Sequence, residues 1–234
     1  MKAVARTHIG RVRKSNQDSL LVLPESCPIY AVADGMGGHL GGDTASRMAI
    51  EGLKTLCGQT PSPEAIVACY QKITKEIFLR QQQDESLSGM GTTLTMLWEA
   101  EKVIILGHVG DSRAYLLRAG QLYQMSNDHS LVQEMVRSGL LAREAAASYP
   151  YRNVITRAVG TEEKVLCDTA VYDKQPGDRW LLCSDGLSEY LDEGMLLDSM
   201  LLDDLEAAAD RMIVSALEGG GRDNISLVLL EVAA

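Results

Sequence analysis

The sequence predicts an α+β fold in which two antiparallel sheets pack face to face and helices cover their outer sides. Apolar runs of strand length follow one another through short turns, and pairs of helical patterns interrupt these runs. A parallel α/β sheet would instead alternate single strands with helices. The chain has 234 residues, 46% of them apolar, which is enough for one large domain with a substantial core. Because no repeat, low-complexity tract or long linker divides it, we expect a single domain over residues 1–234.

The first third of the chain predicts two strands followed by two helices. The strands are expected at 19–23 and 29–33, and the first helix over about 43–57, with Asp43 or Thr44 as its N-cap. Ser62 can cap the second helix, and Pro63 suits its first turn, where an N–H group is not needed. Apolar residues then recur at helical spacing at Ile66, Val67, Tyr70, Ile73, Ile77 and Phe78.

The rest of the chain predicts a meander of strands, a helix with an irregular segment, and a second group of strands and helices. The segment 130–160 begins with a helical pattern and continues as an irregular stretch rich in Ala and Tyr. Strands are expected at 92–98, 102–109, 112–118, within 119–125, and at 168–174, 178–184 and 224–232, with helices near 187–200 and 203–219.

Charge and cysteine usage argue against several classes of protein. A net charge of −10 disfavours sequence-independent binding of nucleic acid, which needs a basic surface. No apolar stretch approaches the ~18–20 residues that span a bilayer, and the N-terminus lacks the apolar core of a signal peptide. The five cysteines are odd in number and none has CxxC spacing, so we expect reduced thiols rather than a disulfide framework or a zinc site. These features indicate a soluble, cytoplasmic protein.

Acidic residues recur where apolar strands begin or end. They are Asp18, Asp34, Asp111, Asp185 and Asp223. An Asp-Gly pair by itself is usually a turn, which is the simpler interpretation of Asp34 and Asp185 taken singly. Several such acids without alternating basic partners would repel one another, so at neutral pH they would take up protons or bind a cation. Oxygen ligands favour Mg²⁺ or Mn²⁺, and the four histidines show no zinc-type spacing.

The stretch YAVADGMGGHLGG, residues 30–42, places one of these acids before five glycines. Gly35 can offer its carbonyl oxygen to a metal beside Asp34, and the later glycines allow bare backbone to crowd the site. The stretch lacks the Lys-Ser/Thr of a P-loop and the GxGxxG register of a dinucleotide fold. We therefore exclude a nucleoside triphosphate site here.

Eight motifs occur along the chain in a characteristic order. They are GRVRKSNQDS (10–19), ADGMGGHLGG (33–42), SGMGTTL (88–94), GHVGDSRAYLLR (107–118), NDHS (127–130), RNVITRAVG (152–160), LLCSDGL (181–187) and GRDNISLV (221–228). This set resembles the metal-dependent Ser/Thr protein phosphatases, the PPM or type-2C family, in its compact bacterial form. Single motifs such as SDG are unspecific, but the ordered set is specific and covers practically the whole chain from about Thr7.

The resemblance implies an α-β-β-α sandwich with two Mn²⁺ or Mg²⁺ ions at one end of the sheets. It implies a protein phosphatase that hydrolyses phosphoserine and phosphothreonine monoesters by attack of a hydroxide bridging the two ions. The ligands it implies are Asp34 as the bridge, Gly35 through its carbonyl, Asp185 and Asp223 on the other ion, and Asp18 mainly through metal-bound water.

The resemblance also assigns a phosphate ligand and a further metal ligand. Arg13 would hold the substrate phosphate, which a guanidinium grips with two parallel hydrogen bonds. Without the motif set, Arg13 would be interpreted as an ordinary surface arginine. Asp111 would bind a third, weaker ion together with Asp185, although a simple turn is an equal alternative for it.

The sequence departs from the family pattern at several positions. Gln17 stands where many members have Glu, and Met36 where eukaryotic relatives have a histidine that is a candidate general acid. His39 lies three residues further on and is a possible proton donor, with a loop histidine that bonds to backbone as the alternative. Tyr149 stands where a histidine is common, within the segment 137–153 that resembles the substrate-contacting flap of bacterial relatives.

The resemblance implies phosphoprotein substrates, among them a Ser/Thr kinase of the eukaryotic type. We expect the protein to be a monomer that neither binds nucleic acid nor inserts into a membrane.

Two alternative functions remain open from the sequence. A two-metal phosphodiesterase or nuclease would use similar ligands, but net acidity and the lack of aromatic-basic interleaving disfavour it. A binding module that has lost its chemistry would show a damaged ligand set, whereas the acids and Arg13 are all present.

Overall fold

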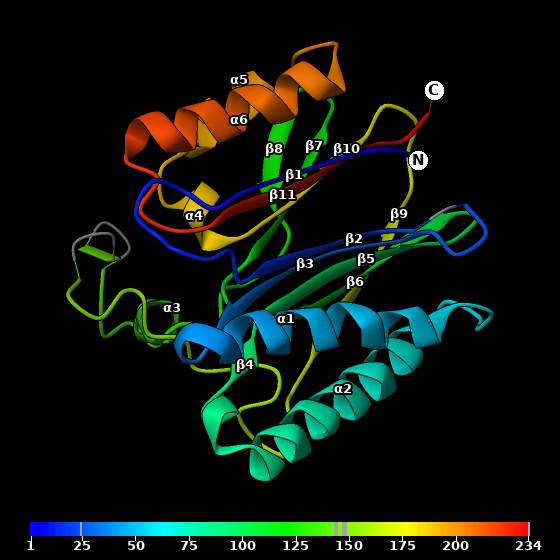
Figure 1. Ribbon diagram of the computed structural model, residues 1–234. Helices are drawn as coiled ribbons and strands as arrows, with labels where there is room; N and C mark the ends of the chain where they lie inside the picture. The colour runs from blue at the N-terminus through cyan, green and yellow to red at the C-terminus, as the bar shows by residue number, and fades with distance from the viewer. Residues whose placement is uncertain (24, 143–144, 147–148, 234) are drawn as a thin grey trace.

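Two antiparallel β-sheets pack face to face in the computed structural model, and helices cover the outer side of each sheet (Figure 1). The structure describes residues 1–23, 25–142, 145–146 and 149–233, with only the backbone described at residues 38–40. The predicted α+β class, with two antiparallel sheets flanked by helices, is confirmed. The chain termini lie close together, because the first strand pairs with the last one (Figure 1).

All strand pairs in both sheets are antiparallel among the described residues. One sheet has the order β1 (Lys2–His8), β11 (Ile225–Glu231), β10 (Arg179–Cys183), β7 (Arg113–Arg118) and β8 (Gln121–Gln124). The other has the order β2 (Asp18–Val22), β3 (Ile29–Met36), β5 (Leu94–Glu99), β6 (Val103–Val109) and β9 (Asp168–Asp173), with β4 (Gly91–Thr92) paired to the end of β3.

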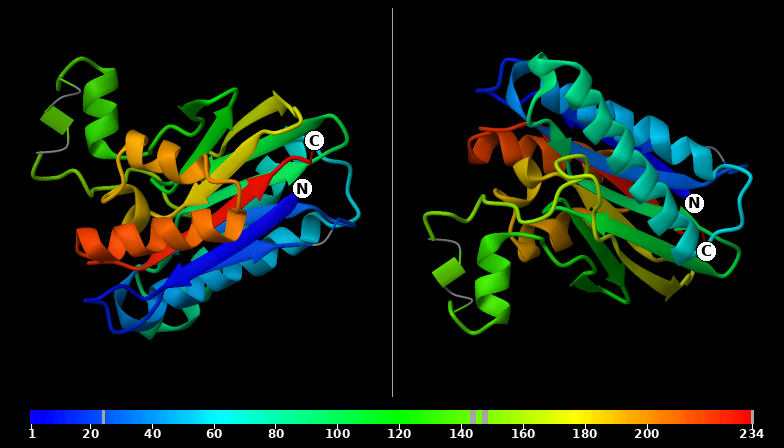
Figure 2. Two further views of the ribbon diagram at one scale, coloured as in Figure 1. Left: turned by 90° about the horizontal axis from the view of Figure 1, so that it is seen from above. Right: turned by 90° about the horizontal axis from the view of Figure 1, so that it is seen from below.

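The helices lie on the two outer faces and at one side of the sandwich (Figures 1 and 2). The β2–β9 sheet carries α1 (Gly38–Leu53) and α2 (Pro63–Gln83), with the short 3₁₀ turns η1 (Lys54–Leu56) and η2 (Glu85–Leu87). The β1–β8 sheet carries α4 (Asp185–Ser188), α5 (Glu193–Met200) and α6 (Leu205–Gly219). The remaining helix, α3 (Leu131–Arg137), lies to one side of the sheets, near the ends of the central strands.

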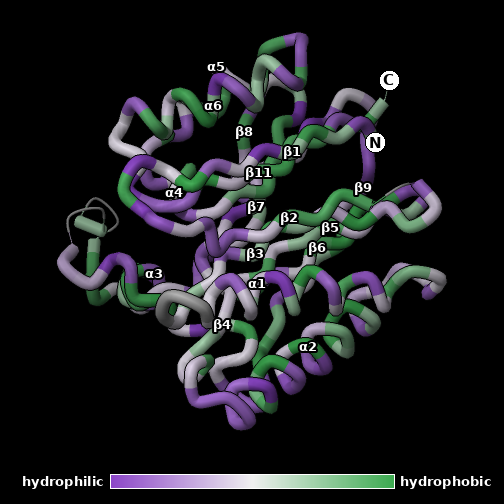
Figure 3. The backbone as a smooth tube through the Cα atoms, in the orientation of Figure 1, coloured by the Kyte–Doolittle hydropathy of each residue, from purple (hydrophilic) through white to green (hydrophobic). Residues whose placement is uncertain are grey.

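Side chains along each central strand alternate between two apolar layers. This explains why the first part of β3 is a continuous apolar run. Ala31 and Ala33 face the layer beneath α1 and α2, whereas Tyr30 and Val32 face the layer between the two sheets. Because side chains alternate along a strand, a strand buried on both sides is apolar at every position. Figure 3 shows apolar residues along the strands and polar residues along the outward faces of the helices.

The sequence analysis missed one strand and placed the start of one helix wrongly. The first strand, β1, was not expected, because the run KAVARTH is short and contains charged residues. In the structure it is only partly buried. It forms by pairing along its whole length with β11, more than two hundred residues later. The first helix begins at Gly38 instead of Asp43 or Thr44, and its N-cap is Gly37, which adopts a φ of 109° and makes no side-chain cap bond. Only glycine adopts such a backbone conformation readily.

The expectation of reduced thiols is also wrong, since a disulfide joins Cys27 and Cys57. Cys27 lies in the turn before β3 and Cys57 lies directly after η1, so the packing of α1 along β3 brings the two Cα atoms within 5.3 Å. Spacing along the sequence cannot reveal this proximity, which depends on tertiary structure. Cys69 and Cys183 are free and buried, and Cys167 is free and half-buried.

No helix within the described parts of the chain is long and apolar enough to cross a membrane.

Candidate active site

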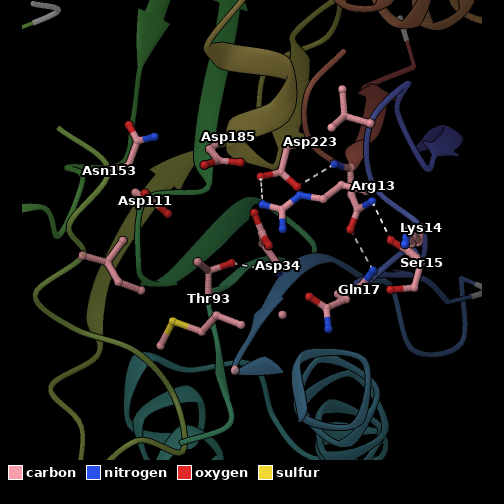
Figure 4. A pocket seen from close by; sticks show the side chains of 16 residues that line it. Arg13, Lys14, Ser15, Gln17, Asp34, Thr93, Asp111, Asn153, Asp185 and Asp223 are labelled. Atoms are coloured by element: carbon pink, nitrogen blue, oxygen red, sulfur yellow. Dashed lines mark hydrogen bonds and ion pairs between the residues drawn. The ribbon is translucent and has the colours of Figure 1, made fainter. Parts of the chain in front are cut away.

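The predicted acids gather at one end of the sandwich, where strands of both sheets begin or end. Asp18 opens β2 and pairs across the sheet with Asp34 of β3. Asp111 follows β6, Asp185 follows β10 at the start of α4, and Asp223 precedes β11. Figure 4 shows the carboxylates of Asp34, Asp185 and Asp223 turned toward one another.

A cavity of about 540 Å³ opens over these side chains. Its lining combines the acidic end of both sheets with the loop before β2 and with the segment after α3. The lining residues are Val12, Arg13, Lys14, Ser15, Gln17, Asp34, Gly35, Met36, Gly37, Thr93, Asp111, Asn153, Ile155, Asp185, Asp223 and Asn224. Asp18 lies just behind this lining, next to Ser184.

The carboxylates are held in a poorly solvated and mutually repulsive environment. Burial raises the pKa of Asp34 well above its usual range, and the nearby charges of Asp18 and Asp185 raise it further. Burial also raises the pKa of Asp185 to about 8, with Asp111 and Asp223 adding to the effect. For Asp18 and Asp111 burial is again the main cause, and each pKa rises to about 6. Such a cluster favours either protonation or a bound cation.

Two carboxylate oxygens in the cluster have no hydrogen-bond partner within the described residues, although they are buried. They are Oδ1 of Asp18 and Oδ1 of Asp185. A buried acceptor without a partner costs free energy, and a hard cation would remove that cost. Within the described residues no group of three or more His, Cys, Asp or Glu side chains is arranged to enclose an ion. The oxygen donors around the cavity, carboxylates and backbone carbonyls, suit a hard cation that completes its coordination shell with water.

Neighbouring hydroxyl groups fix the acids at the strand ends. Ser184 Oγ donates to Asp18 Oδ2 over 2.9 Å and accepts from the Ser226 N–H over 3.0 Å. Thr93 holds both backbone groups of Asp34, since its Oγ1 accepts from the Asp34 N–H and its own N–H donates to the Asp34 carbonyl, each over 2.9 Å. Its Oγ1 also bonds to Ser112 Oγ over 2.7 Å. The motifs SGMGTTL and LLCSDGL contained Thr93 and Ser184, but sequence reasoning assigned them no role.

Glycines let the backbone pack tightly around the acids. A Cβ atom on Gly35 would lie 2.1 Å from the carbonyl oxygen of Gly42, so both ends of the glycine-rich stretch must stay bare where they meet. A Cβ atom on Gly186, next to Asp185, would lie 2.0 Å from the carbonyl oxygen of Asn224. Close backbone approach, rather than turn formation alone, therefore explains the glycines beside Asp34 and Asp185.

Arg13 reaches into the cavity from the loop before β2. Its Nη2 donates to Asp223 Oδ2 over 2.5 Å, and about half of the side chain, 52%, remains exposed (Figure 4). A guanidinium in this position can bind an oxyanion in the cavity while it remains paired with a carboxylate of the site.

Asn224 is a further residue of the site that sequence reasoning missed. Its side-chain amide donates to the carbonyls of Ile9 and Ser15 over 2.9 and 3.0 Å, and its Oδ1 accepts from the Gln17 N–H over 2.8 Å. One asparagine thus ties the loop that carries Arg13 to the strand end that carries Asp223. The only sequence signal was its place directly after that aspartate.

Two predicted features lie partly outside the described residues. His39 begins α1, but its side chain is among those not described, so its role stays a prediction. Residues 143–144 and 147–148 of the expected flap, 137–153, are likewise outside the described part of the chain. Within the described part, Asn153 lines the cavity, and the rings of Tyr149 and Tyr151 meet edge to face at 6.1 Å.

Comparison with known proteins identifies the family. The family described as Protein phosphatase 2C matches residues 6–218. The chain is 40% identical to the serine/threonine phosphatase stp of Listeria monocytogenes serotype 4b, over 99% of this chain and 96% of the relative. The crystal structure of the Mycobacterium tuberculosis serine/threonine phosphatase PstP/Ppp is similar with a TM-score of 0.94 and 36% identity, over 100% of this chain and 99% of the other.

A second solved structure carries metal. It is the catalytic domain of the serine threonine protein phosphatase PstP in complex with two manganese ions, with a TM-score of 0.90, 35% identity, and coverage of 100% of this chain and 98% of the other. The fold agrees with these solved structures, and the family match covers most of the chain. The chain belongs to the protein phosphatase 2C family and is a phosphoprotein phosphatase.

Proposed function

We propose that this phosphatase removes phosphate from phosphoserine and phosphothreonine in proteins with the help of two Mn²⁺ or Mg²⁺ ions. The observation that carries the proposal is the cluster of buried, mutually repelling carboxylates with orphaned oxygens around one cavity. In this proposal Asp34 would bind both ions, and Gly35 would contribute its carbonyl oxygen. Asp185 and Asp223 would hold the second ion, and Asp18 would act mainly through metal-bound water.

When bound, two divalent ions would lower the pKa of the water between them and so supply the nucleophile for in-line attack on phosphorus. The protein's own contribution is to place the partners. Arg13 would bind two oxygens of the phosphate, and its bond to Asp223 aims the guanidinium at the cavity. Thr93 keeps Asp34 fixed through both backbone groups. His39 is the proposed proton donor to the leaving oxygen, and Asp111 is proposed to bind a third ion with Asp185.

The proposed substrates are phosphoproteins, whose phosphorylated side chain would enter the cavity of about 540 Å³ beside Arg13. The family resemblance adds a Ser/Thr kinase of the eukaryotic type to the proposed substrates. We propose that the enzyme acts as a monomer.

The test is turnover of a phosphothreonine peptide after complete removal of metal. We expect activity to disappear in EDTA and to return with Mn²⁺, and less fully with Mg²⁺, because the proposed ligands are all oxygen donors. Turnover that persists in metal-free buffer would contradict the proposal. Faster hydrolysis of bis-p-nitrophenyl phosphate than of the monoester would favour a phosphodiesterase, and metal binding without any turnover would favour a binding module.

A further inference from the structure

Three exposed cations lie in the two loops next to the cavity, and the proposed chemistry does not use them. Arg11 and Lys14 flank Arg13 in the loop before β2, and Arg222 lies in the loop before β11. All three side chains are exposed, and none forms an ion pair with any residue that the structure describes. Arg13 differs from them, because Asp223 binds its guanidinium.

Hydrogen bonds join the two loops that carry these three cations. The Arg11 N–H donates to the Gly221 carbonyl over 2.7 Å, which joins the two loops directly. Asn224 joins them again through its bonds to Ile9, Ser15 and Gln17. The Arg11 side chain also lies against Gly221, whose added Cβ would be 3.3 Å from Arg11 Cγ. The backbone positions of these three residues are therefore tied to the loop that carries Arg13.

These three positive side chains belong to a protein whose net charge is negative. The protein has a net charge of −10, so its surface as a whole repels acidic peptides. Lys14 lines the cavity beside Arg13, and Arg222 directly precedes the site residue Asp223. Unpaired cations next to the phosphate site of an acidic protein would attract acidic residues of a substrate that flank its phosphorylated residue.

We propose that Arg11, Lys14 and Arg222 form a basic rim that selects substrates with acidic residues beside the phosphorylated residue. The inference rests on the proposed function and adds the substrate class. The alternative is that the rim is an ordinary solvated surface. Lys2, Lys75 and Lys102 are also exposed and without an ion pair in the described structure, but they lie on β1, on α2 and in the β5–β6 turn, away from the cavity lining. They provide a matched control for the removal of three positive charges.

The test compares three phosphothreonine peptides that differ only in their flanking residues, which are acidic, neutral or basic. With saturating Mn²⁺, we expect the wild type to hydrolyse the acidic peptide about three- to tenfold more efficiently in kcat/KM than the neutral one, as a few exposed ion pairs would allow. The difference should arise in KM and should shrink between about 50 and 300 mM salt, because exposed charges are screened.

The variant Arg11→Ala/Lys14→Ala/Arg222→Ala should bring the ratio of acidic to neutral peptide to about one. The control Lys2→Ala/Lys75→Ala/Lys102→Ala should keep the wild-type ratio. An equal loss of preference in both variants, or equal kcat/KM for all peptides in the wild type, would overturn the proposed role of the basic rim. The proposed phosphatase function would still stand. Absence of turnover on all three peptides would overturn the proposed function and this inference with it.

Discussion

Arg13 and Asp34 both line the cavity, yet their proposed roles predict different kinetic effects. Arg13→Ala should mainly raise KM for a phosphopeptide, by about ten- to a hundredfold, because a hydrogen bond to a charged group is worth about 1.5–3 kcal/mol. Asp34→Asn should instead abolish kcat, since Asp34 is the acid proposed to be shared by both ions. Steady-state kinetics of both variants check this. If Asp34→Asn keeps more than about a tenth of kcat, a loss below ~1.4 kcal/mol in the barrier, the assignment is wrong.

The raised pKa values of the acids predict how metal binding and stability depend on pH. In the metal-free protein the pKa of Asp18 is about 6 and that of Asp185 about 8, whereas an aspartate in the unfolded chain has a pKa near 4. The folded state therefore binds these protons more tightly. The stability they contribute is fully present below about pH 4 and is lost as the pH rises through about 6 to 8.

The melting temperature measured with and without Mn²⁺ checks this at several pH values. The gain produced by Mn²⁺ should increase from pH 5 to pH 8, because the ion binds the ionised carboxylates and relieves their repulsion. Asp185→Asn should flatten the dependence, since it removes a carboxyl group whose pKa is raised to about 8. A gain that stays constant or falls with rising pH would contradict the interpretation of the cluster as a metal centre.

At the level of elements, we predict that loss of the disulfide lowers the stability of the protein but not its activity. Cys27 and Cys57 are 30 residues apart in sequence, and closing such a loop stabilises a protein by about 3–4 kcal/mol in the chain-entropy model. Cys27 precedes β3, whereas Asp34 lies near the other end of that strand, roughly 20 Å away at ~3.3 Å per residue. Cys27→Ser/Cys57→Ser should therefore lower the melting temperature by about 10 °C and leave turnover unchanged.

Scanning calorimetry of the oxidised and reduced protein tests this prediction. The double variant is the control, because a reductant should not shift its melting temperature. Identical melting temperatures for the oxidised and reduced wild type would show that the bond contributes nothing to stability.

The elements that the sequence predicted well are those whose signal is local. Ser62 caps α2 as expected, with its Oγ accepting from the Ala65 N–H over 3.1 Å. The predicted strand 29–33 lies within β3, and the predicted strand 102–109 matches β6 to within one residue. The features it missed depend on partners distant in the chain. β1 is a strand only because β11 pairs with it, and the start of α1 depends on Gly37 fitting a left-handed conformation beside the site. The bonds of Asn224 and the disulfide likewise join segments whose proximity only the folded chain reveals.

At the scale of the whole molecule, the sandwich explains why acids so far apart in sequence meet. Both sheets end at the same edge, and the register that pairs Asp18 with Asp34 places two of the acids side by side. The other three leave or enter strands of both sheets at that edge. The sequence showed that each acid lies at a strand end. That all these strand ends meet at one edge followed only from the resemblance and from the fold.

The central claim is that these acids together hold a metal centre, and titration calorimetry with Mn²⁺ on EDTA-treated protein tests it most directly. We predict that the wild type binds two ions tightly and a third weakly, that Asp111→Ala loses only the weak site, and that Asp34→Asn loses tight binding. Far-UV circular dichroism of each variant controls for folding. Fewer than two tightly bound ions in the folded wild type, or unchanged binding in Asp34→Asn, would contradict the account.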